Sequence, residues 1–247
     1  MTCRAVALAV FRFHDELEAF LAPGRRGCAF EYTCARAATI KHALESLGVP
    51  HTEVGRVIVN GQAGTLSRIV READAIEVYP HRPAGAAGDE RHVFIADAHL
   101  GGLARLLRML GFDTLYDNAY SDRTILDIAA SERRVILTRD RELLKCREAL
   151  RGAFVHARKP ERQLQEVAIR YGLAWQARPF TLCLDCNLAL QAADDASIAA
   201  RVPARIAAQY SVFMRCPGCD RILWQGSHWR RMREMLGTLV EIPENSF

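Results

Sequence analysis

The sequence has no apolar run as long as the roughly eighteen residues that a membrane-spanning helix needs, so we expect no membrane partner. Its start runs into acidic residues and lacks the small-residue cleavage site of a secretory signal, which predicts a cytoplasmic protein. The excess of positive over negative charge is also small, because the formal net charge is only +4. Nucleic-acid binding would therefore have to come from local basic patches. Repeats and low-complexity tracts are absent, which argues against a solenoid or a disordered chain.

Cysteine is used in two different ways. Four cysteines are scattered and are interpreted as incidental or buried thiols of a reducing compartment: Cys3, Cys28, Cys34 and Cys146. The other four form two CxxC pairs separated by 29 residues: Cys183 with Cys186, and Cys216 with Cys219. This spacing is typical of one structural Zn²⁺ site with four thiolate ligands. Disulfides or a redox CxxC are the alternatives. A site with all four positions filled by protein would be closed and non-catalytic.

Residues 1–82 predict a small α/β domain. The alternation Val6, Leu8, Val10 indicates a first strand over 5–13, and a second strand is expected near 29–33. A short helix over 39–48 follows, and then two strands, 57–61 and 74–80. The order strand, strand, helix, strand, strand is that of a β-grasp domain. A linker rich in Pro, Gly and Ala follows at 83–91.

Residues 92–175 alternate apolar strands with helices, which predicts a parallel sheet with helices packed against it. Helices are expected over 100–110, from 122 to about 133, over 141–150 and over 160–171, and strands over 93–96, 112–116, 135–137 and 153–156. The remaining segment, 176–247, holds the CxxC pairs, a loop and short helix interrupted by Pro203, and a final helix for which Ser227 is a candidate N-cap.

Two of the predicted strands end on an aspartate, Asp97 and Asp140. The carboxyl ends of parallel strands meet at one edge of a sheet, where ligands bind. We therefore expect both carboxylates to share a divalent cation, in an arrangement that suits phosphodiester hydrolysis. The alternative is that each aspartate only caps the helix that follows it.

A third carboxylate is expected, because Mg²⁺ or Mn²⁺ takes oxygen ligands. Asp122 at the start of a helix is preferred to Asp127, which points away from it on the same helix. Asp113 and Asp117 stay open as alternatives, and Glu142 could reach in beside Asp140.

Residues 1–82 resemble the ubiquitin-like sulfur-carrier proteins through the turn Val59-Asn60-Gly61 and the ending Asp74-x-Ile76-x-Val78-x-Pro80. Those carriers end in a free diglycine, whereas this chain continues through 81–90. A role in sulfur transfer is therefore disfavoured, and a role in docking a protein or ribonucleoprotein partner is preferred.

Residues 93 to about 232 resemble the PIN-like C-terminal RNase domain of the mutator-seven exonuclease. The likeness rests on these segments: Ala96-Asp97-Ala98-His99-Leu100-Gly101-Gly102, Ser121-Asp122-x-x-Ile125-Leu126, Leu137-Thr138-Arg139-Asp140-Arg141-Glu142-Leu143, Cys183-x2-Cys186-Asn187 and Cys216-Pro217-x-Cys219. The resemblance implies metal-dependent RNA hydrolysis at Asp97, Asp122 and Asp140, with Mg²⁺ or Mn²⁺. It also implies the fold class, an α/β protein in which a β-grasp domain precedes a PIN-like α/β/α domain and a four-cysteine zinc ribbon.

The expected substrate is RNA, either single-stranded or structured. Arg105 and Arg108 share one helix face and, with Arg139, could contact phosphates. The final helix adds three further candidates for RNA binding: His228, Arg230 and Arg231. PIN nucleases commonly use four acids, and only three can be matched here. A non-catalytic module that binds RNA or a ribonucleoprotein is therefore the alternative function.

Overall fold

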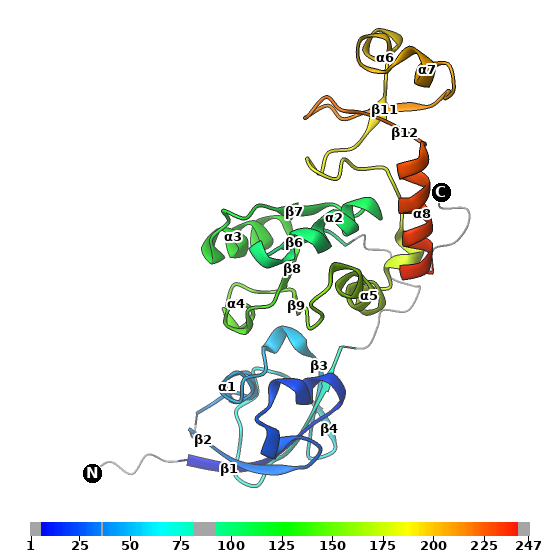
Figure 1. Cartoon of the computed structure of the whole chain (residues 1–247). Coiled ribbons are helices and arrows are strands. Elements are labelled where there is room, and N and C mark those ends of the chain that lie inside the picture. Colours follow the sequence, from blue (N-terminus) through cyan, green and yellow to red (C-terminus); the bar gives the residue numbers. More distant parts are fainter. Residues whose placement is uncertain (1–5, 36, 82–91, 242–247) are drawn as a thin grey trace. The chain divides into compact units, whose positions relative to one another are not determined.

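The structure is a computed structural model that describes residues 6–35, 37–81 and 92–241 (Figure 1). The chain divides into two compact units. The first combines Met1–Pro83 with Asp122–Phe154, and the second combines Ala84–Ser121 with Val155–Phe247. The expected linker at 83–91 lies outside the described residues. None of the helices in the described ranges is both long and apolar enough to cross a membrane.

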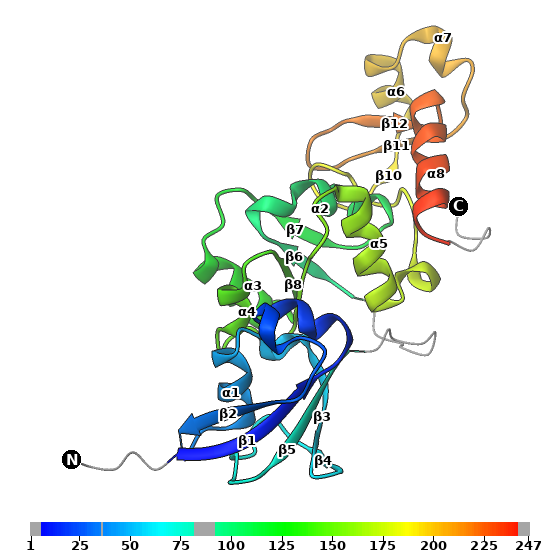
Figure 2. The same cartoon turned by 60° about the horizontal axis from the view of Figure 1, so that its bottom comes forward.

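The first unit contains a five-stranded sheet with the order β2-β1-β5-β3-β4, in which β1 and β5 are parallel neighbours (Figure 2). The strands are β1 (Val6–Phe13), β2 (Phe30–Ala35), β3 (Val54–Val59), β4 (Gln62–Gly64) and β5 (Ala75–Pro80). Helix α1 (Ile40–Ser46) packs its buried side chains into the same core as the sheet. Short 3-10 helices lie beside them: η1 (Asp15–Phe20), η2 (Pro23–Arg25) and η3 (His51–Glu53). This order confirms the β-grasp prediction and adds the short β4.

The even-numbered apolar residues at the start of β1 face solvent, and the odd-numbered residues face the core. Val6, Leu8 and Val10 are 56%, 38% and 37% exposed, whereas the odd positions from Ala7 to Phe13 are buried. Side chains alternate across a strand, so one face must be chosen. The buried face carries the large aromatic side chains of Phe11 and Phe13, which pack in the core with the small side chains of Ala7 and Ala9.

A two-residue turn joins β3 to β4, and it carries both backbone conformations that such a turn requires. Asn60 has φ 52° and Gly61 has φ 79°. Two successive positive φ values are typical of the type I′ turn, whose twist matches that of a hairpin. The predicted strand and turn at 57–61 are therefore confirmed.

Asp74 locks this turn to the start of β5. Its carboxylate, only 3% exposed, accepts two bonds from Arg68, at 2.6 and 3.0 Å, and one from Asn60 Nδ2 at 2.9 Å. The Arg71 backbone N–H donates a further bond of 2.8 Å. These hydrogen bonds lower the pKa of Asp74 to about 2, and the bond from Arg68 has the largest effect.

We expect Asp74→Asn to lower the free energy of unfolding by about 2 kcal/mol at pH 7, because a shift of nearly two pKa units reflects stabilisation of that size. The folded-state pKa lies below the ordinary 3.8, so the contribution is complete above about pH 4 and disappears as the pH falls towards 2. Urea unfolding of wild type and variant at pH 7 and pH 3 measures this. Asp127→Asn, at an exposed position, serves as control, and an equal loss at both pH values would contradict the prediction.

The rest of the first unit is α3 (Asp122–Glu132), β8 (Val135–Thr138), α4 (Arg141–Lys145) and β9 (Gly152–Phe154). Strands β8 and β9 are parallel, and all four residues of β8 are buried. The prediction for α4 was wrong at its end, because the helix stops at Lys145 instead of 150. Leu143 and Leu144 are its only buried residues, so no apolar stripe continues the helix.

In the second unit, β6 (Phe94–Ala96) and β7 (Thr114–Tyr116) form another parallel pair, as expected for wound α/β units. They are accompanied by η4 (Ala98–Leu100), α2 (Gly101–Met109), α5 (Pro160–Tyr171) and η5 (Leu173–Gln176), and α2 packs against α5. Gly111 follows the end of α2 and has a positive φ of 87°. A Cβ at this position would also overlap the Arg178 carbonyl oxygen. Both the positive φ and the close approach therefore require glycine.

A three-stranded antiparallel sheet of β10 (Gln191–Ala192), β11 (Phe213–Arg215) and β12 (Ile222–Trp224) completes this unit. The insertion between β10 and β11 forms two short helices, α6 (Asp195–Arg201) and α7 (Ala204–Ala207), with Pro203 at the break (Figure 1). Helix α8 (Ser227–Leu239) follows and contacts α5. Ser227 is not the cap, because Gly226 holds that position and no side chain caps the helix.

Candidate functional site

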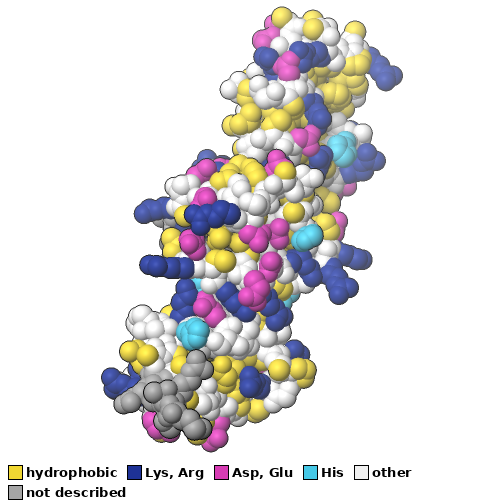
Figure 3. Space-filling view, turned by 90° about the vertical axis from the view of Figure 1, so that its left-hand side faces the viewer, with side chains coloured by type: hydrophobic (Ala, Val, Ile, Leu, Met, Phe, Trp, Pro, Cys, Tyr) yellow, Lys and Arg dark blue, Asp and Glu magenta, His cyan; other side chains and the backbone are white. Residues whose placement is uncertain are grey.

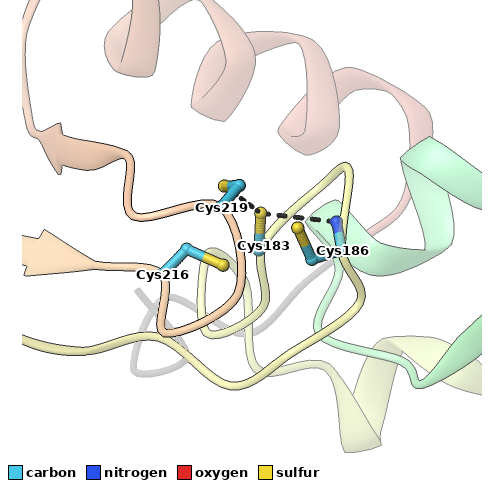
Figure 4. Close-up of side chains that lie close together, drawn as sticks. All are labelled: Cys183, Cys186, Cys216 and Cys219. Carbon is cyan, nitrogen blue, oxygen red and sulfur yellow. Dashed lines mark hydrogen bonds between the residues drawn. The ribbon is translucent and has the colours of Figure 1, made fainter.

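The two CxxC pairs meet in space. The Sγ atoms of Cys183, Cys186, Cys216 and Cys219 all lie within 4.8 Å of one another, and all four thiols are free (Figure 4). Sγ of Cys183 lies 3.8 Å from Sγ of Cys219. Sulfurs bound to Zn²⁺ at about 2.3 Å in a tetrahedron are separated by about 3.8 Å, whereas a disulfide needs about 2.05 Å. The donor set therefore fits one tetrahedral metal ion such as Zn²⁺ and excludes the disulfide alternative.

Each pair sits on the same kind of turn. The residue after the second cysteine of each pair, Asn187 or Asp220, has φ 61° and donates its N–H to the carbonyl of the first cysteine at 2.9 Å. The N–H of Cys183 donates to the Leu188 carbonyl at 2.8 Å, and the N–H of Cys216 donates to the Arg221 carbonyl at 3.0 Å. Asn and Asp tolerate positive φ better than other side chains, so the sequence favours two matching knuckles.

Arg108 of α2 attaches the first knuckle to the rest of the second unit. Its Nε donates to the Thr114 carbonyl at 2.9 Å, and its Nη1 donates to the carbonyls of Leu184 and Asp185 at 2.9 Å each. The side chain of Asn187 adds a bond to Asp113 at 2.6 Å. Burial lowers the pKa of Arg108, whose residue is only 6% exposed.

Arginines also lie beside this cluster. Four thiolates around one Zn²⁺ would leave an excess of negative charge, which requires nearby cations in a partly buried site. Arg108 lies beside Cys183 and Cys186, and Arg221 beside Cys219 and Cys183. Asp185 within the first knuckle pairs with Arg221 and, at 2.7 Å, with Arg105.

Arg105 and Arg108, which the sequence places on one helix face, are therefore both engaged with the first knuckle. Arg105 is half exposed, whereas Arg108 is fully committed to three carbonyls. Arg108 is for this reason a structural residue of the knuckle rather than a candidate for RNA binding. His228, Arg230 and Arg231 are all exposed residues near the start of α8. Arg139 is half-buried after β8, in the first unit.

Asp140 lies two residues after the end of β8 and caps α4. Its Oδ1 accepts the Glu142 N–H at 2.7 Å, and its own N–H donates to Thr138 Oγ1 at 2.9 Å. The capping role that the sequence left open is therefore present at Asp140. That bond occupies one carboxylate oxygen of an exposed side chain.

Asp122, the first residue of α3, lies in the same region as Asp140. Burial raises the pKa of the Cys146 thiol, and four carboxylates raise it further: Glu148, Asp122, Asp140 and Glu142. Acidic side chains of α3, of α4 and of the segments on either side of α4 thus act electrostatically on one thiol, which nothing in the spacing of Cys146 signalled. The competing Asp127 instead forms an exposed ion pair with Arg123 at 2.9 Å.

Asp97 stands at the carboxyl end of β6, in the second unit, and is half-buried. It occupies the N-cap position of η4, but its side chain makes no capping hydrogen bond there. Simple capping therefore does not account for the carboxylate of Asp97. His99, two residues further on, is exposed.

Charged side chains of both signs are interspersed over the face of the molecule in Figure 3, as the low net charge suggests. No surface in that view is basic throughout. On this face a polyanion would therefore meet only small groups of arginines rather than a general positive field.

Comparison with known structures concerns the β-grasp part. The crystal structure of H. volcanii small archaeal modifier protein 1 is 22% identical, matching 30% of this chain and 97% of that one, with a TM-score of 0.24. The solution structure of the Haloferax volcanii HVO 2177 protein is 18% identical, matching 32% and 88%, with a TM-score of 0.27. The sequence has no significant match among curated proteins.

Two protein-family models match the sequence. The Mut7-C ubiquitin description matches residues 6–85, which contain the whole β-grasp sheet. The Mut7-C RNAse domain description matches residues 92–236, which contain both parallel strand pairs and the four-cysteine cluster. The second match covers more than half of the chain, and this protein therefore belongs to the Mut7-C RNAse domain family, with a Mut7-C ubiquitin-like domain ahead of the RNAse domain.

Proposed function

We propose that this protein is a metal-dependent, PIN-like ribonuclease that hydrolyses RNA phosphodiester bonds at Asp97, Asp122 and Asp140. The observation that carries the proposal is the Mut7-C RNAse domain match over 92–236. It is supported by two aspartates, Asp97 and Asp140, that each follow a strand of a parallel pair. The carboxylates of Asp122 and Asp140 both raise the pKa of the Cys146 thiol, which adds to this support.

The three carboxylates would hold Mg²⁺ or Mn²⁺, since both ions prefer oxygen ligands. Such an ion, when bound, lowers the pKa of a coordinated water and offsets charge on the phosphorane. The protein's own contribution is to fix the carboxylates, as the Glu142 N–H does for Asp140. Water attacks the phosphorus, the bond from phosphorus to O3′ breaks, and O3′ takes up a proton. The products would be a 3′-hydroxyl and a 5′-phosphate.

We propose that the four-cysteine cluster holds one structural Zn²⁺. Its sulfur separation and its two matched knuckles support this role. With four protein ligands the ion has no open position for substrate, so the cluster is assigned to folding rather than to catalysis.

The experiment that tests the function is direct. The full chain is incubated with end-labelled single-stranded and hairpin RNAs in Mg²⁺, in Mn²⁺ and in EDTA, and the ends of the products are identified. Cleavage that depends on the metal and leaves 5′-phosphates is the expected result. If RNA is bound but not cut with any metal, the non-catalytic binding function replaces this proposal. The exposed His228, Arg230 and Arg231 near the start of α8 would be available to RNA in that second function.

We expect Arg230→Ala with Arg231→Ala to weaken RNA binding without abolishing cleavage at saturating RNA. Each arginine that neutralises a phosphate releases counterions, so the slope of log K against log salt should fall by about one for each arginine removed from the interface. Fluorescence anisotropy at several salt concentrations measures the slope. Arg71→Ala removes an exposed arginine from the β-grasp domain and serves as control. An unchanged slope in the double variant would remove α8 from the interface.

The remaining assignments are also proposals. The division into domains at 1–82, 92–175 and 176–247, with a linker at 83–91, is supported by the sheets that lie within each segment. Arg105 and Arg139 are retained as candidate phosphate contacts, together with His228. The β-grasp domain is proposed to dock a protein or ribonucleoprotein partner. The cytoplasm is retained as the compartment, because a cluster of free thiols suits a reducing environment.

A further inference from the structure

The β-grasp domain contacts the segment that carries Asp140. Both belong to the first compact unit. On the β-grasp side the contacts come from Phe20 at the end of η1 and from η3. On the other side they come from β9 and from α4, whose N-cap is Asp140.

Arg141, the first residue of α4, lies against two aromatic rings. Its guanidinium carbon is 4.9 Å from the centre of the Phe20 ring and 5.5 Å from that of Phe154. The two rings meet edge to face at 5.3 Å. Nη1 of Arg141 also donates to the Phe20 carbonyl at 3.2 Å. A planar cation on two ring faces is a contact that arginine makes and lysine reproduces poorly.

A buried carboxylate makes the second contact. Glu53 of η3 is 1% exposed, and its Oε1 accepts the backbone N–H of Phe154 at 2.8 Å. Burying a carboxylate is costly unless it is hydrogen-bonded, so the Phe154 N–H stabilises this arrangement.

These contacts reach Asp140 by two short routes. Arg141 follows Asp140 directly in the chain. Phe154 pairs with Thr138 in the parallel register of β8 and β9, and Thr138 Oγ1 accepts the Asp140 N–H. The backbone of Asp140 is therefore fixed on both sides by residues that the β-grasp domain holds.

We infer that the β-grasp domain is a built-in positioning part of the nuclease, in which Phe20 and Glu53 hold Arg141 and Phe154 and thereby fix the Asp140 carboxylate for its cation. The inference rests on the proposed function and deepens it. Arg141 is a positioning residue that acts through Asp140. Partner docking elsewhere on the β-grasp domain stays compatible with this role.

The test uses the full chain with Arg141→Lys, which keeps the charge and removes the planar stacking. Phe20→Leu, which keeps an apolar side chain in the core, and the double variant complete a mutant cycle. Mn²⁺ binding is followed by the electron paramagnetic resonance of free Mn²⁺, cleavage by separate kcat and KM values for RNA, and the 140–145 backbone by amide hydrogen exchange. Arg25→Lys is the matched control, because Arg25 lies over two rings, Phe30 and Tyr32, inside the β-grasp domain.

Arg141→Lys is expected to weaken Mn²⁺ binding about tenfold, the usual effect of losing a group that orients a metal ligand, with an unchanged KM for RNA. Exchange over 140–145 should rise. Phe20→Leu should act in the same direction, and the double variant should be no worse than Arg141→Lys alone, because both act through one contact. Arg25→Lys should change none of these quantities.

A raised KM with unchanged Mn²⁺ affinity would mean that Arg141 contacts RNA, and this would overturn the inference. Unchanged exchange over 140–145 in Arg141→Lys would also overturn it. Should the wild-type chain bind no Mn²⁺, the proposed function fails, and the positioning of the cation fails with it. If amide exchange over 140–145 still rises in Arg141→Lys, the contact between Arg141 and Phe20 stabilises that backbone and has no role in cation binding.

Discussion

Replacing Asp140 by asparagine is expected to reduce Mn²⁺-dependent RNA cleavage at least about a hundredfold, since a metal ion supplies several kcal/mol of transition-state stabilisation. Asparagine has nearly the same size and can still accept the Glu142 N–H, so the cap of α4 and the fold should persist. What is lost is the negative charge that a hard dication requires. Steady-state kinetics over a range of Mn²⁺ concentrations, with circular dichroism of each variant, measures the effect.

Asp97→Asn and Asp122→Asn should behave in the same way, while RNA binding stays intact or strengthens because each variant removes repulsion from phosphates. The matched control is Asp127→Asn, on the same helix as Asp122 but paired with Arg123 at the surface. It should cleave RNA at the wild-type rate. Full activity in Asp97→Asn or Asp140→Asn would refute the proposed site. If Asp127→Asn loses activity and Asp122→Asn keeps it, Asp127 would replace Asp122 as the third metal ligand.

Replacing Cys216 by serine is expected to release the proposed zinc ion and unfold the β10–β12 sheet. Structural Zn²⁺ contributes on the order of 10 kcal/mol in small domains of this kind, far more than the small core around Val202, Phe213 and Ile222 can supply. Because Arg108 and Asn187 attach the first knuckle to β7, exchange should rise over 113–116 as well as over 183–192. Metal analysis of the purified chain should fall from one zinc ion to none.

Cys28→Ser, which removes an exposed thiol of the β-grasp part, is the control and should keep its zinc. Amides of β3 and β5, in the other unit, should exchange at the same rate in both variants. Chelation of the wild-type chain should reproduce the Cys216→Ser result. A chain that carries no zinc when purified under reducing conditions, yet protects 183–192 fully, would contradict the structural role.

Local patterns in the sequence were sufficient for much of the architecture. The two CxxC pairs, the Asn60-Gly61 turn and the helix stripe at Ile40 and Leu44 each depend on residues a few positions apart. Their periodicity, turn chemistry and spacing predict the helix, the turn and the cysteine cluster correctly because the relevant contacts are local. The same holds for Asp140, whose place after β8 follows from one apolar run.

Contacts between distant segments decided the rest. The sequence by itself determined the order of the elements, the β-grasp and the four cysteine ligands. Only the tertiary structure turned Phe11 and Phe13 of β1 to the core, buried Arg108 against carbonyls of the first knuckle, and placed Phe20 on Arg141. The physical reason is that burial and pairing depend on which surfaces meet in space, and a pattern read along one segment holds no record of its partner.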